Sequence, residues 1–148
     1  MKNLLIVCTM LLFAVSAGAQ GMKDPSDWTI KVVPNKDAYD IVFHVDLQAG
    51  WHVYALNPGG DGSFIPPSFS LEKGAYSISG PVKELGTLIE EEVEAVDGKV
   101  RYFKGKADFV QTVKAKTGAI VKGTYGYQLC NESMCLPPKT KPFSVLIP

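Results

Sequence analysis

Short stretches in which apolar and polar side chains alternate recur along most of the chain. The clearest is 39–47, where apolar residues at the odd positions share one face and mostly polar residues share the other. A period of two is typical of a half-buried β-strand. Helical periodicity is not convincing anywhere. Similar, shorter runs lie at 28–33, 51–56, 68–71, 75–79, 100–103, 106–114, 119–127 and 142–147.

Turn-forming residues separate most of these runs. They include Pro34-Asn35, Ala49-Gly50, Gly80-Pro81, Asp97-Gly98, Thr117-Gly118 and the Gly- and Pro-rich loop 57–67. Eight or nine short strands at this spacing predict an all-β fold, an immunoglobulin-like antiparallel β-sandwich, with a small barrel as the alternative. No repeat or linker divides the chain, so we expect one domain over 20–148.

The first residues have the pattern of an export signal. Lys2 precedes an apolar run over 4–15, and Ala17-Gly18-Ala19 supplies small residues for cleavage. The run is too short to span a bilayer about 30 Å thick at about 1.5 Å per residue. We therefore predict a signal peptide at 1–19, cleaved near Ala19, and a periplasmic location. A retained membrane anchor is the alternative.

Composition narrows the classes of partner. The chain has 15 Lys and Arg against 15 Asp and Glu, so removal of Lys2 with the signal leaves one net negative charge. This balance gives no electrostatic case for nucleic acid or an anionic membrane surface. No later apolar stretch approaches the length of about 18 residues that spans a bilayer, so we expect no direct membrane insertion of the mature domain.

Other motifs give little further chemistry. The chain has no nucleotide-binding glycine loop, nucleophile elbow or zinc-protease motif. We expect His44, on the polar face of 39–47, to be solvated or hydrogen-bonded. The acidic residues of 90–94 indicate either a solvated loop or strand edge, or a segment that flanks an active-site cover.

Two cysteines remain after the signal. Cys8 lies within it, which leaves Cys130 and Cys135, with four residues between them, as one dithiol or one disulfide in a compartment where disulfides persist. The turn-forming segment 131–133 allows the sulfurs to meet if the Cα atoms come within about 4.4 to 6.8 Å. A structural staple over so short a loop stabilises by only about 2 kcal/mol. Spacing alone leaves redox function and a staple open.

Met134 adds a third possibility for the pair. Thiolate and thioether sulfurs suit Cu(I), so Cys130, Met134 and Cys135 form a candidate copper set. Met134 serves equally well as an apolar plug beside the sulfurs. No Met-rich or His-rich run supports copper handling.

The flanking residues resemble a known family. The run Tyr127-Gln128-x-Cys130-x4-Cys135-x-Pro137-Pro138-x-Thr140 is similar to the active-site hairpin of the N-terminal periplasmic domain of DsbD, a transmembrane thiol:disulfide interchange protein. Gly50-Trp51-His52-Val53-Tyr54 resembles the family's segment of aromatic residues near the cysteines, and Val100-Arg101-Tyr102-Phe103 is a third match. The resemblance runs from about Trp28 to Ile147.

The resemblance implies an immunoglobulin-like module whose cysteine pair cycles between dithiol and disulfide. Cys135 is expected to form the mixed disulfide with a partner, and Cys130 to resolve it, with no cofactor beyond this redox-active disulfide. The implied electron donor is a membrane-embedded protein, acting through a thioredoxin-like domain. The implied acceptors are periplasmic disulfide isomerases or other oxidised proteins, with a link to cytochrome c biogenesis. The rival hypothesis is an immunoglobulin-like binding or assembly module with a purely structural disulfide.

The resemblance also places residues around the pair. The expected neighbours are His52, Tyr54, Val96, Tyr127, Met134 and Pro137. The family covers its cysteines with an aromatic residue on a cap loop, whereas the corresponding stretch 94–97 has none. Either Val96 is a weaker shield, the alignment slips, or Phe64 covers the site.

Two further expectations concern charge and the electron donor. Lys139 and Lys141 favour a thiolate, whereas Glu132 opposes it, so no particular thiol pKa is predicted. The sequence ends at Pro148 without an electron carrier, so we expect the donor in another polypeptide.

Overall fold

One long strand organises the fold. The computed structural model describes residues 23–94, 96 and 98–148, and its longest strand is β7 (Lys99–Ala115). One edge of β7 pairs with two strands in turn. The part of β7 before Gly105 pairs with β3 (His52–Gly59), and the part after Gly105 pairs with β2 (Ala38–Leu47). Its other edge pairs with β6 (Lys83–Glu92) and β5 (Tyr76–Ile78). Gly105 has a φ of 72°, in the left-handed region that glycine tolerates, so β7 bends where its partner changes.

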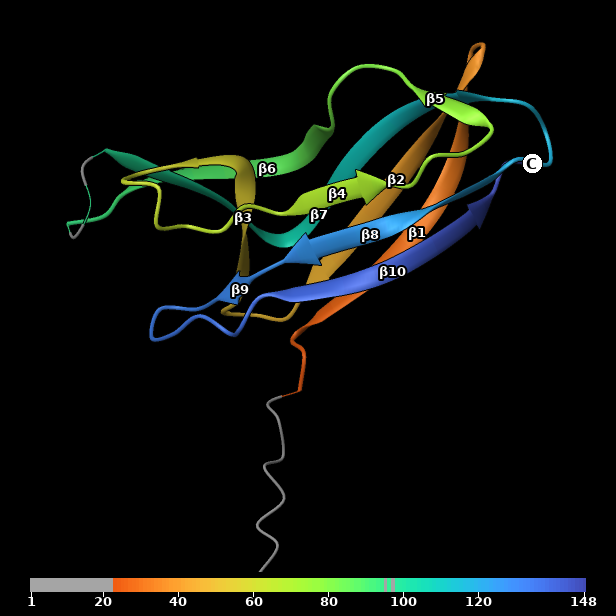
Figure 1. The fold of residues 1–148 in the computed structure, drawn as a ribbon. Coiled ribbons are helices and arrows are strands. Elements are labelled where there is room, and N and C mark those ends of the chain that lie inside the picture. The colour runs from red at the N-terminus through yellow and green to blue at the C-terminus, as the bar shows by residue number, and fades with distance from the viewer. Residues whose placement is uncertain (1–22, 95, 97) are drawn as a thin grey trace, which may run out of the picture.

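The remaining strands complete two sheets (Figure 1). β1 (Ser26–Asn35) extends the first sheet beside β2, and the two-residue β9 (Leu129–Cys130) extends it beside β3. The second sheet has the order β10 (Lys139–Leu146), β8 (Ile120–Tyr127), β4 (Ser68–Leu71). All pairings are antiparallel, and the described residues form no helix. The predicted all-β, immunoglobulin-like antiparallel sandwich is confirmed.

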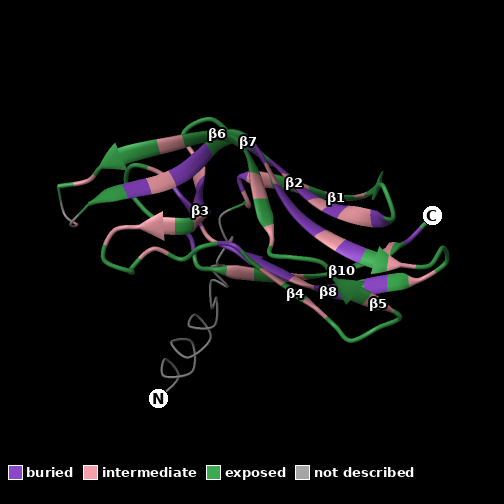
Figure 2. Cartoon of the chain, turned by 90° about the horizontal axis from the view of Figure 1, so that it is seen from above, coloured by how far each residue is buried: buried purple, intermediate pink, exposed green. Residues whose placement is uncertain are grey.

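The main core lies between the sheets. Burial alternates along β2, where Ile41, Phe43 and Val45 are fully buried and His44 and Asp46 face outward (Figure 2). Phe43 contacts aromatic rings of the second sheet, with Phe69 and Phe143 at centroid distances of 4.7 and 4.9 Å. Burying a side chain of this size stabilises by about 1.5 to 3 kcal/mol, so such cross-sheet contacts hold the layers together.

The structure corrects the predicted strand list in two places. The runs 100–103 and 106–114 belong to one continuous strand, β7, and β6 and β9 were not among the predicted strands. Most of β6 is exposed on both faces, so its sequence carries no apolar alternation to mark it. Within the described part of the chain, no helix is long and apolar enough to cross a bilayer. The predicted signal peptide at 1–19 lies outside the described residues.

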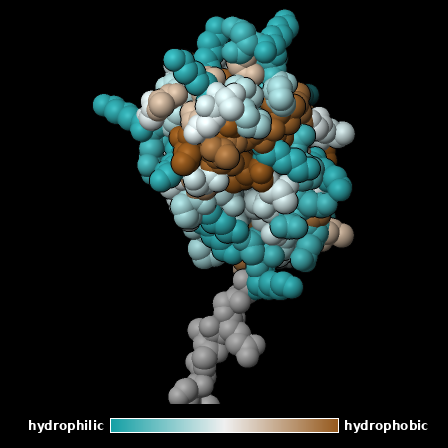
Figure 3. Space-filling view, turned by 90° about the vertical axis from the view of Figure 1, so that its right-hand side faces the viewer, coloured by the Kyte–Doolittle hydropathy of each residue, from teal (hydrophilic) through white to brown (hydrophobic). Residues whose placement is uncertain are grey.

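Apolar side chains also gather at one end of the molecule (Figure 3). This end, at the right of Figure 1, carries β5 and the last residues of β10. Ile78 of β5 is 55% exposed, and the register partners Ile120 and Leu146 are 52% and 61% exposed. β9, which contains Cys130, lies away from this end, so this apolar surface is separate from the cysteine hairpin.

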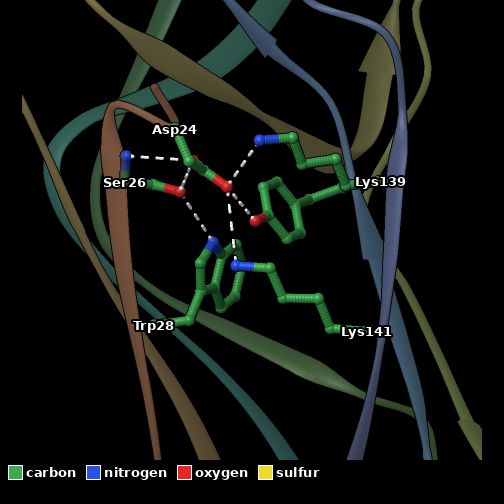
Figure 4. A network of polar contacts seen from close by, with 6 residues as sticks. Asp24, Ser26, Trp28, Lys139 and Lys141 are labelled. Carbon is green, nitrogen blue, oxygen red and sulfur yellow. Dashed lines mark hydrogen bonds and ion pairs between the residues drawn. The ribbon is translucent and has the colours of Figure 1, made fainter. Parts of the chain in front are cut away.

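A carboxylate joins the two sheets (Figure 4). Asp24, just before β1, accepts hydrogen bonds from the hydroxyl of Tyr127 at 2.5 Å and from Nζ of Lys139 at 3.0 Å. Its other oxygen accepts from the backbone N–H and the hydroxyl of Ser26, at 3.1 and 2.7 Å. Lys141 adds a contact at 3.5 Å. Tyr127 and Lys139 are register partners, so Asp24 holds both strands where they enter the cysteine hairpin.

These bonds decide the ionisation of Asp24. Burial alone raises the pKa of its carboxyl, but hydrogen bonds from Tyr127, Ser26 and Lys139 outweigh burial and hold that pKa well below its usual range. The carboxylate is therefore more stable in the folded chain than in the unfolded one. Asp24 contributes stability above the unfolded pKa and loses this contribution as pH falls through the folded pKa.

Asp24→Asn tests this network. We expect the free energy of unfolding to fall by about 2 kcal/mol near neutral pH, because hydrogen bonds to a charged acceptor are lost. The difference from wild type should shrink below about pH 4, because Asp24 of the unfolded wild-type chain then binds a proton, which lowers the stability of the wild type. Urea unfolding at about pH 7 and about pH 3 measures both values. Asp27→Asn, which changes an exposed carboxylate nearby, is the matched control. A deficit of equal size at both pH values would contradict the assignment.

Candidate functional site

Strand register places the buried cysteine on the outer face of the larger sheet. One residue from each of three adjacent strands enters the main core, and these register partners are Leu129, Val53 and Phe103. Side chains alternate along a strand, so the next row lies on the opposite face. That row consists of Cys130, His52 and Lys104. Cys130 therefore belongs to a separate environment outside the main core.

A second apolar cluster surrounds Cys130. Its buried members are Tyr54, Val100, Tyr102 and Cys130 itself, and the partly buried members that pack against them are Phe64, Ile89, Val93 and Val96. Beside the cluster is an open cavity of about 380 Å³. Its polar and charged lining comes from β3, β6, β7 and the cysteine hairpin: His52, Glu91, Lys104, Asn131 and Glu132. The site thus combines an apolar floor with a charged rim.

The hairpin brings the two cysteines together. Cys130 and Cys135 are joined by a disulfide, and their Cα atoms are 4.0 Å apart, slightly closer than the expected range. The side-chain oxygen of Asn131 accepts hydrogen bonds from the backbone N–H groups of Ser133 and Met134, both at 2.9 Å. This arrangement is an Asx turn, in which a short polar side chain replaces a backbone acceptor. The predicted turn at 131–133 is confirmed.

The two cysteines differ in exposure. Cys130 is 1% exposed and belongs to the apolar cluster, whereas Cys135 is exposed. Met134 beside it is 43% exposed, and Pro137 is also exposed. An approaching molecule therefore reaches Cys135 first.

Hydrogen bonds close the hairpin independently of the disulfide. Gln128 donates from Nε2 to the carbonyl of Leu136 at 3.0 Å, and the Leu136 N–H donates to the carbonyl of Leu129 at 2.8 Å. The Asn131 N–H donates to the carbonyl of Met134 at 2.9 Å. Gln128 was noted in the sequence only as part of a motif. Its contact crosses the hairpin, so only the fold shows its role.

His52 lies among aromatic rings. Its ring centroid is 5.2 Å from that of Tyr54 and 4.6 Å from that of Tyr102. Burial lowers the pKa of His52, the positive charge of Lys104 lowers it further, and Glu91 opposes both. The ring is therefore biased toward its neutral form.

Tyr102 links the cluster to the charged rim. Its hydroxyl donates to the carboxylate of Glu91 at 2.5 Å. Burial, followed by this hydrogen bond, raises the pKa of Tyr102 to about 12. Nζ of Lys104 lies 5.5 Å from the centroid of the Tyr102 ring. The sequence offered no indication of a role for Lys104, because only the register of β3 and β7 brings it to the site.

The acidic residues of 90–94 lie in two different environments. Glu90 and Glu91 lie near the end of β6, where Glu90 pairs with Arg101 at 2.7 Å and Glu91 lines the cavity. Both of the alternatives drawn from the sequence therefore describe part of the run, since one glutamate lies on a solvated strand and the other beside the site.

The other expected neighbours fall into two groups. Tyr54 and Val96 share the cluster of Cys130. Tyr127 instead packs in the main core against Trp28, at a centroid distance of 4.8 Å, and its hydroxyl binds Asp24. It therefore anchors the base of the hairpin.

The expected effect of the two lysines changes as well. Lys139 and Lys141 direct their ammonium groups to Asp24, so a carboxylate offsets the positive charge that the sequence suggested would favour a thiolate.

His44 is hydrogen-bonded, as expected, with Nδ1 2.5 Å from a carboxylate oxygen of Asp108. Among the described residues, no three His, Cys, Asp or Glu side chains are grouped to hold a metal ion.

Phe64 packs against the cluster of Cys130. Its ring centroid is 4.9 Å from that of Tyr54. Gly60 lies beneath the ring with a φ of 67°, and a Cβ there would come within 2.6 Å of Phe64. Val96 packs against the same cluster, while Ala95 and Asp97 of the stretch 94–97 lie outside the described residues. The predicted loop 57–67 begins only after Gly59, because 57–59 belong to β3, and it carries an aromatic side chain of the kind that 94–97 lacks.

Comparison with solved structures supports the fold. The N-terminal periplasmic domain of ScsB from Proteus mirabilis is similar to this chain, with a TM-score of 0.63 and 12% identity. The match covers 84% of this chain and 47% of that one, so this chain spans about half the length of that structure.

Two structures from Neisseria meningitidis are also similar. The reduced DsbD N-terminal domain has 20% identity over 80% of this chain and 84% of its own, with a TM-score of 0.43. The complex between the DsbD and PilB N-terminal domains gives 19% identity over 79% and 80%, with a TM-score of 0.44.

Sequence comparison identifies the family. No curated protein matches the chain. The profile described as thiol:disulfide interchange protein DsbD, N-terminal, matches residues 19–147, which is nearly the whole sequence. The chain therefore belongs to the DsbD N-terminal domain family.

Proposed function

We propose that this chain is an exported thiol:disulfide interchange module that relays two electrons through Cys130 and Cys135. The observation that carries the proposal is the unequal exposure of the pair, with Cys130 buried in an apolar cluster and Cys135 open to a partner. Access is one of the factors that decide which sulfur reacts in thiol–disulfide exchange. Membership of the DsbD N-terminal family supports the same chemistry.

The two cysteines supply every bond that forms or breaks on the domain in this reaction. In the reduced domain, the Cys135 thiolate attacks a disulfide of the partner and forms a mixed disulfide, and one partner thiolate leaves. Sγ of Cys130 then attacks Sγ of Cys135, the bond between Cys135 and the partner breaks, and the second partner thiolate leaves. The partner gains two electrons and two protons, and the domain becomes a disulfide. The proposed cycle needs no other cofactor.

The hairpin has hydrogen bonds that do not depend on the redox state of the cysteines. Backbone and Gln128 hydrogen bonds close it without help from the sulfurs, so we expect the turn to keep its shape when the disulfide is reduced. A structural disulfide adds most stability where few other interactions hold a segment, whereas several hydrogen bonds already close this hairpin. This favours redox cycling over a purely structural disulfide.

We also propose the partners and the compartment. The donor is a membrane-embedded protein, a thioredoxin-like domain, or both in series, and the acceptors are disulfide isomerases or other oxidised proteins in the periplasm. The ScsB structure is a periplasmic domain, and the DsbD domain of Neisseria meningitidis forms a complex with a PilB domain. Export by a signal peptide cleaved near Ala19 is part of the same proposal.

Single-cysteine variants test the order of the two sulfurs. Reduced Cys130→Ser, mixed with glutathione disulfide, should accumulate a stable glutathione adduct on Cys135, seen by intact mass. Cys135→Ser should form its adduct about tenfold more slowly, because buried Cys130 is the only thiol left. The reduced wild-type protein should pass to the intramolecular disulfide. Equal adduct formation by the two variants would contradict the proposed roles.

Phe64→Ala tests the aromatic cover. In a Cys135→Ser background, we expect alkylation of Cys130 by iodoacetamide to accelerate about tenfold, equivalent to about 1.4 kcal/mol in the free energy of local opening. Val96→Ala, in the same cluster, is the matched control and should have the smaller effect because it removes less contact area. If Val96→Ala exposes Cys130 as much as Phe64→Ala does, Phe64 is not the principal cover.

A further inference from the structure

We propose that His52 is the general base that takes the proton from Sγ of Cys130 when this cysteine resolves the mixed disulfide. The inference rests on the proposed function and deepens it. The sequence marked His52 only as an expected neighbour of the pair, whereas the strand register makes it the direct partner of Cys130.

Register places the two side chains together. His52 and Cys130 are direct partners in the antiparallel pair of β3 and β9, and both lie on the outer face of the sheet. Cβ atoms of such partners are about 4.5 to 5.5 Å apart, within the combined reach of an imidazole and a thiol. The rings of Tyr54 and Tyr102 pack against His52 and restrict its rotation. The same ring lines the open cavity, so a proton has a route from the cluster to solvent.

Cys130 needs such a base. It is 1% exposed and packs among Tyr54, Val100 and Tyr102, which offer an apolar environment. A thiolate is poorly stabilised there, since burying an unpaired charge is costly. Removal of the proton as the sulfur attacks avoids a free buried thiolate. Cys135 is exposed and can lose its proton to water, so it has no comparable requirement.

The surrounding charges keep His52 ready to accept a proton. Burial and Lys104 lower its pKa, so the neutral ring predominates near neutral pH. Glu91 acts in the opposite direction on the pKa of His52, but its carboxylate accepts a hydrogen bond from Tyr102. Titratable groups face the site from each strand or loop around it: Tyr54 on β3, Glu91 on β6, Tyr102 and Lys104 on β7, and Glu132 on the hairpin.

The step conserves atoms and charge. The proton moves from Sγ of Cys130 to an imidazole nitrogen of His52, and the sulfur electron pair forms the bond to Sγ of Cys135. The bond between Cys135 and the partner breaks, and its electron pair leaves with the partner sulfur. His52 then releases the proton to solvent through the cavity.

Stopped-flow reaction of the reduced protein with dithiobis(nitrobenzoate) separates the two stages. Attack by Cys135 releases one coloured thiolate, and attack by Cys130 on the mixed disulfide releases a second. His52→Phe keeps an aromatic ring and removes the base. We expect the second phase to slow about 10- to 100-fold near pH 7, toward the lower end of general-base effects, while the first phase changes less than about twofold. The rate of the second phase in His52→Phe should also continue to rise with pH beyond the pH at which the rate of this phase in wild type becomes constant.

Controls separate this inference from the proposed function. The chain has two histidines, so His44→Gln is the matched control and should leave both phases unchanged. His52→Gln provides a second neutral replacement if the phenylalanine variant does not fold. Two phases in wild type with an unchanged second phase in His52→Phe, or equal slowing of both phases, would overturn the role of His52 and leave the exchange function intact. Absence of the second phase in wild type would instead reject the exchange function.

Discussion

The strand register across β9, β3 and β7 is the constraint on which the site depends. Leu129, Val53 and Phe103 must face the main core, and the two-residue period of a strand then forces Cys130, His52 and Lys104 to the outer face. A slip of one residue would bury a charged side chain and expose apolar ones. The hydrophobic effect that builds the sandwich therefore also fixes the surroundings of the cysteine.

The two ends of the hairpin differ in their contacts. At the base, Asp24 binds Tyr127 and Lys139, one from each strand, while Gln128 bonds across the turn. At the tip, Cys135 is exposed and Cys130 is buried. These hydrogen bonds do not involve sulfur, which is consistent with the exchange function proposed for the disulfide.

Local patterns in the sequence predicted the parts of this structure that depend on neighbouring residues. Alternation predicted β2, and the spacing with its turn residues allowed the two sulfurs to meet, as they do in the disulfide. The exposed strand β6 lacked alternation and was missed, and a single glycine inside β7 divided one strand into two predicted ones. The pairing of Lys139 with Asp24 joins residues 115 positions apart, and no short pattern encodes such a contact.

The equilibrium reduction potential of the Cys130–Cys135 pair tests the central claim most directly. Titration against glutathione or dithiothreitol, with thiol alkylation and mass readout, measures it. The account predicts a value between about −120 and −270 mV, the range of disulfide oxidoreductases. A value below about −300 mV, typical of structural disulfides in secreted proteins, would contradict it.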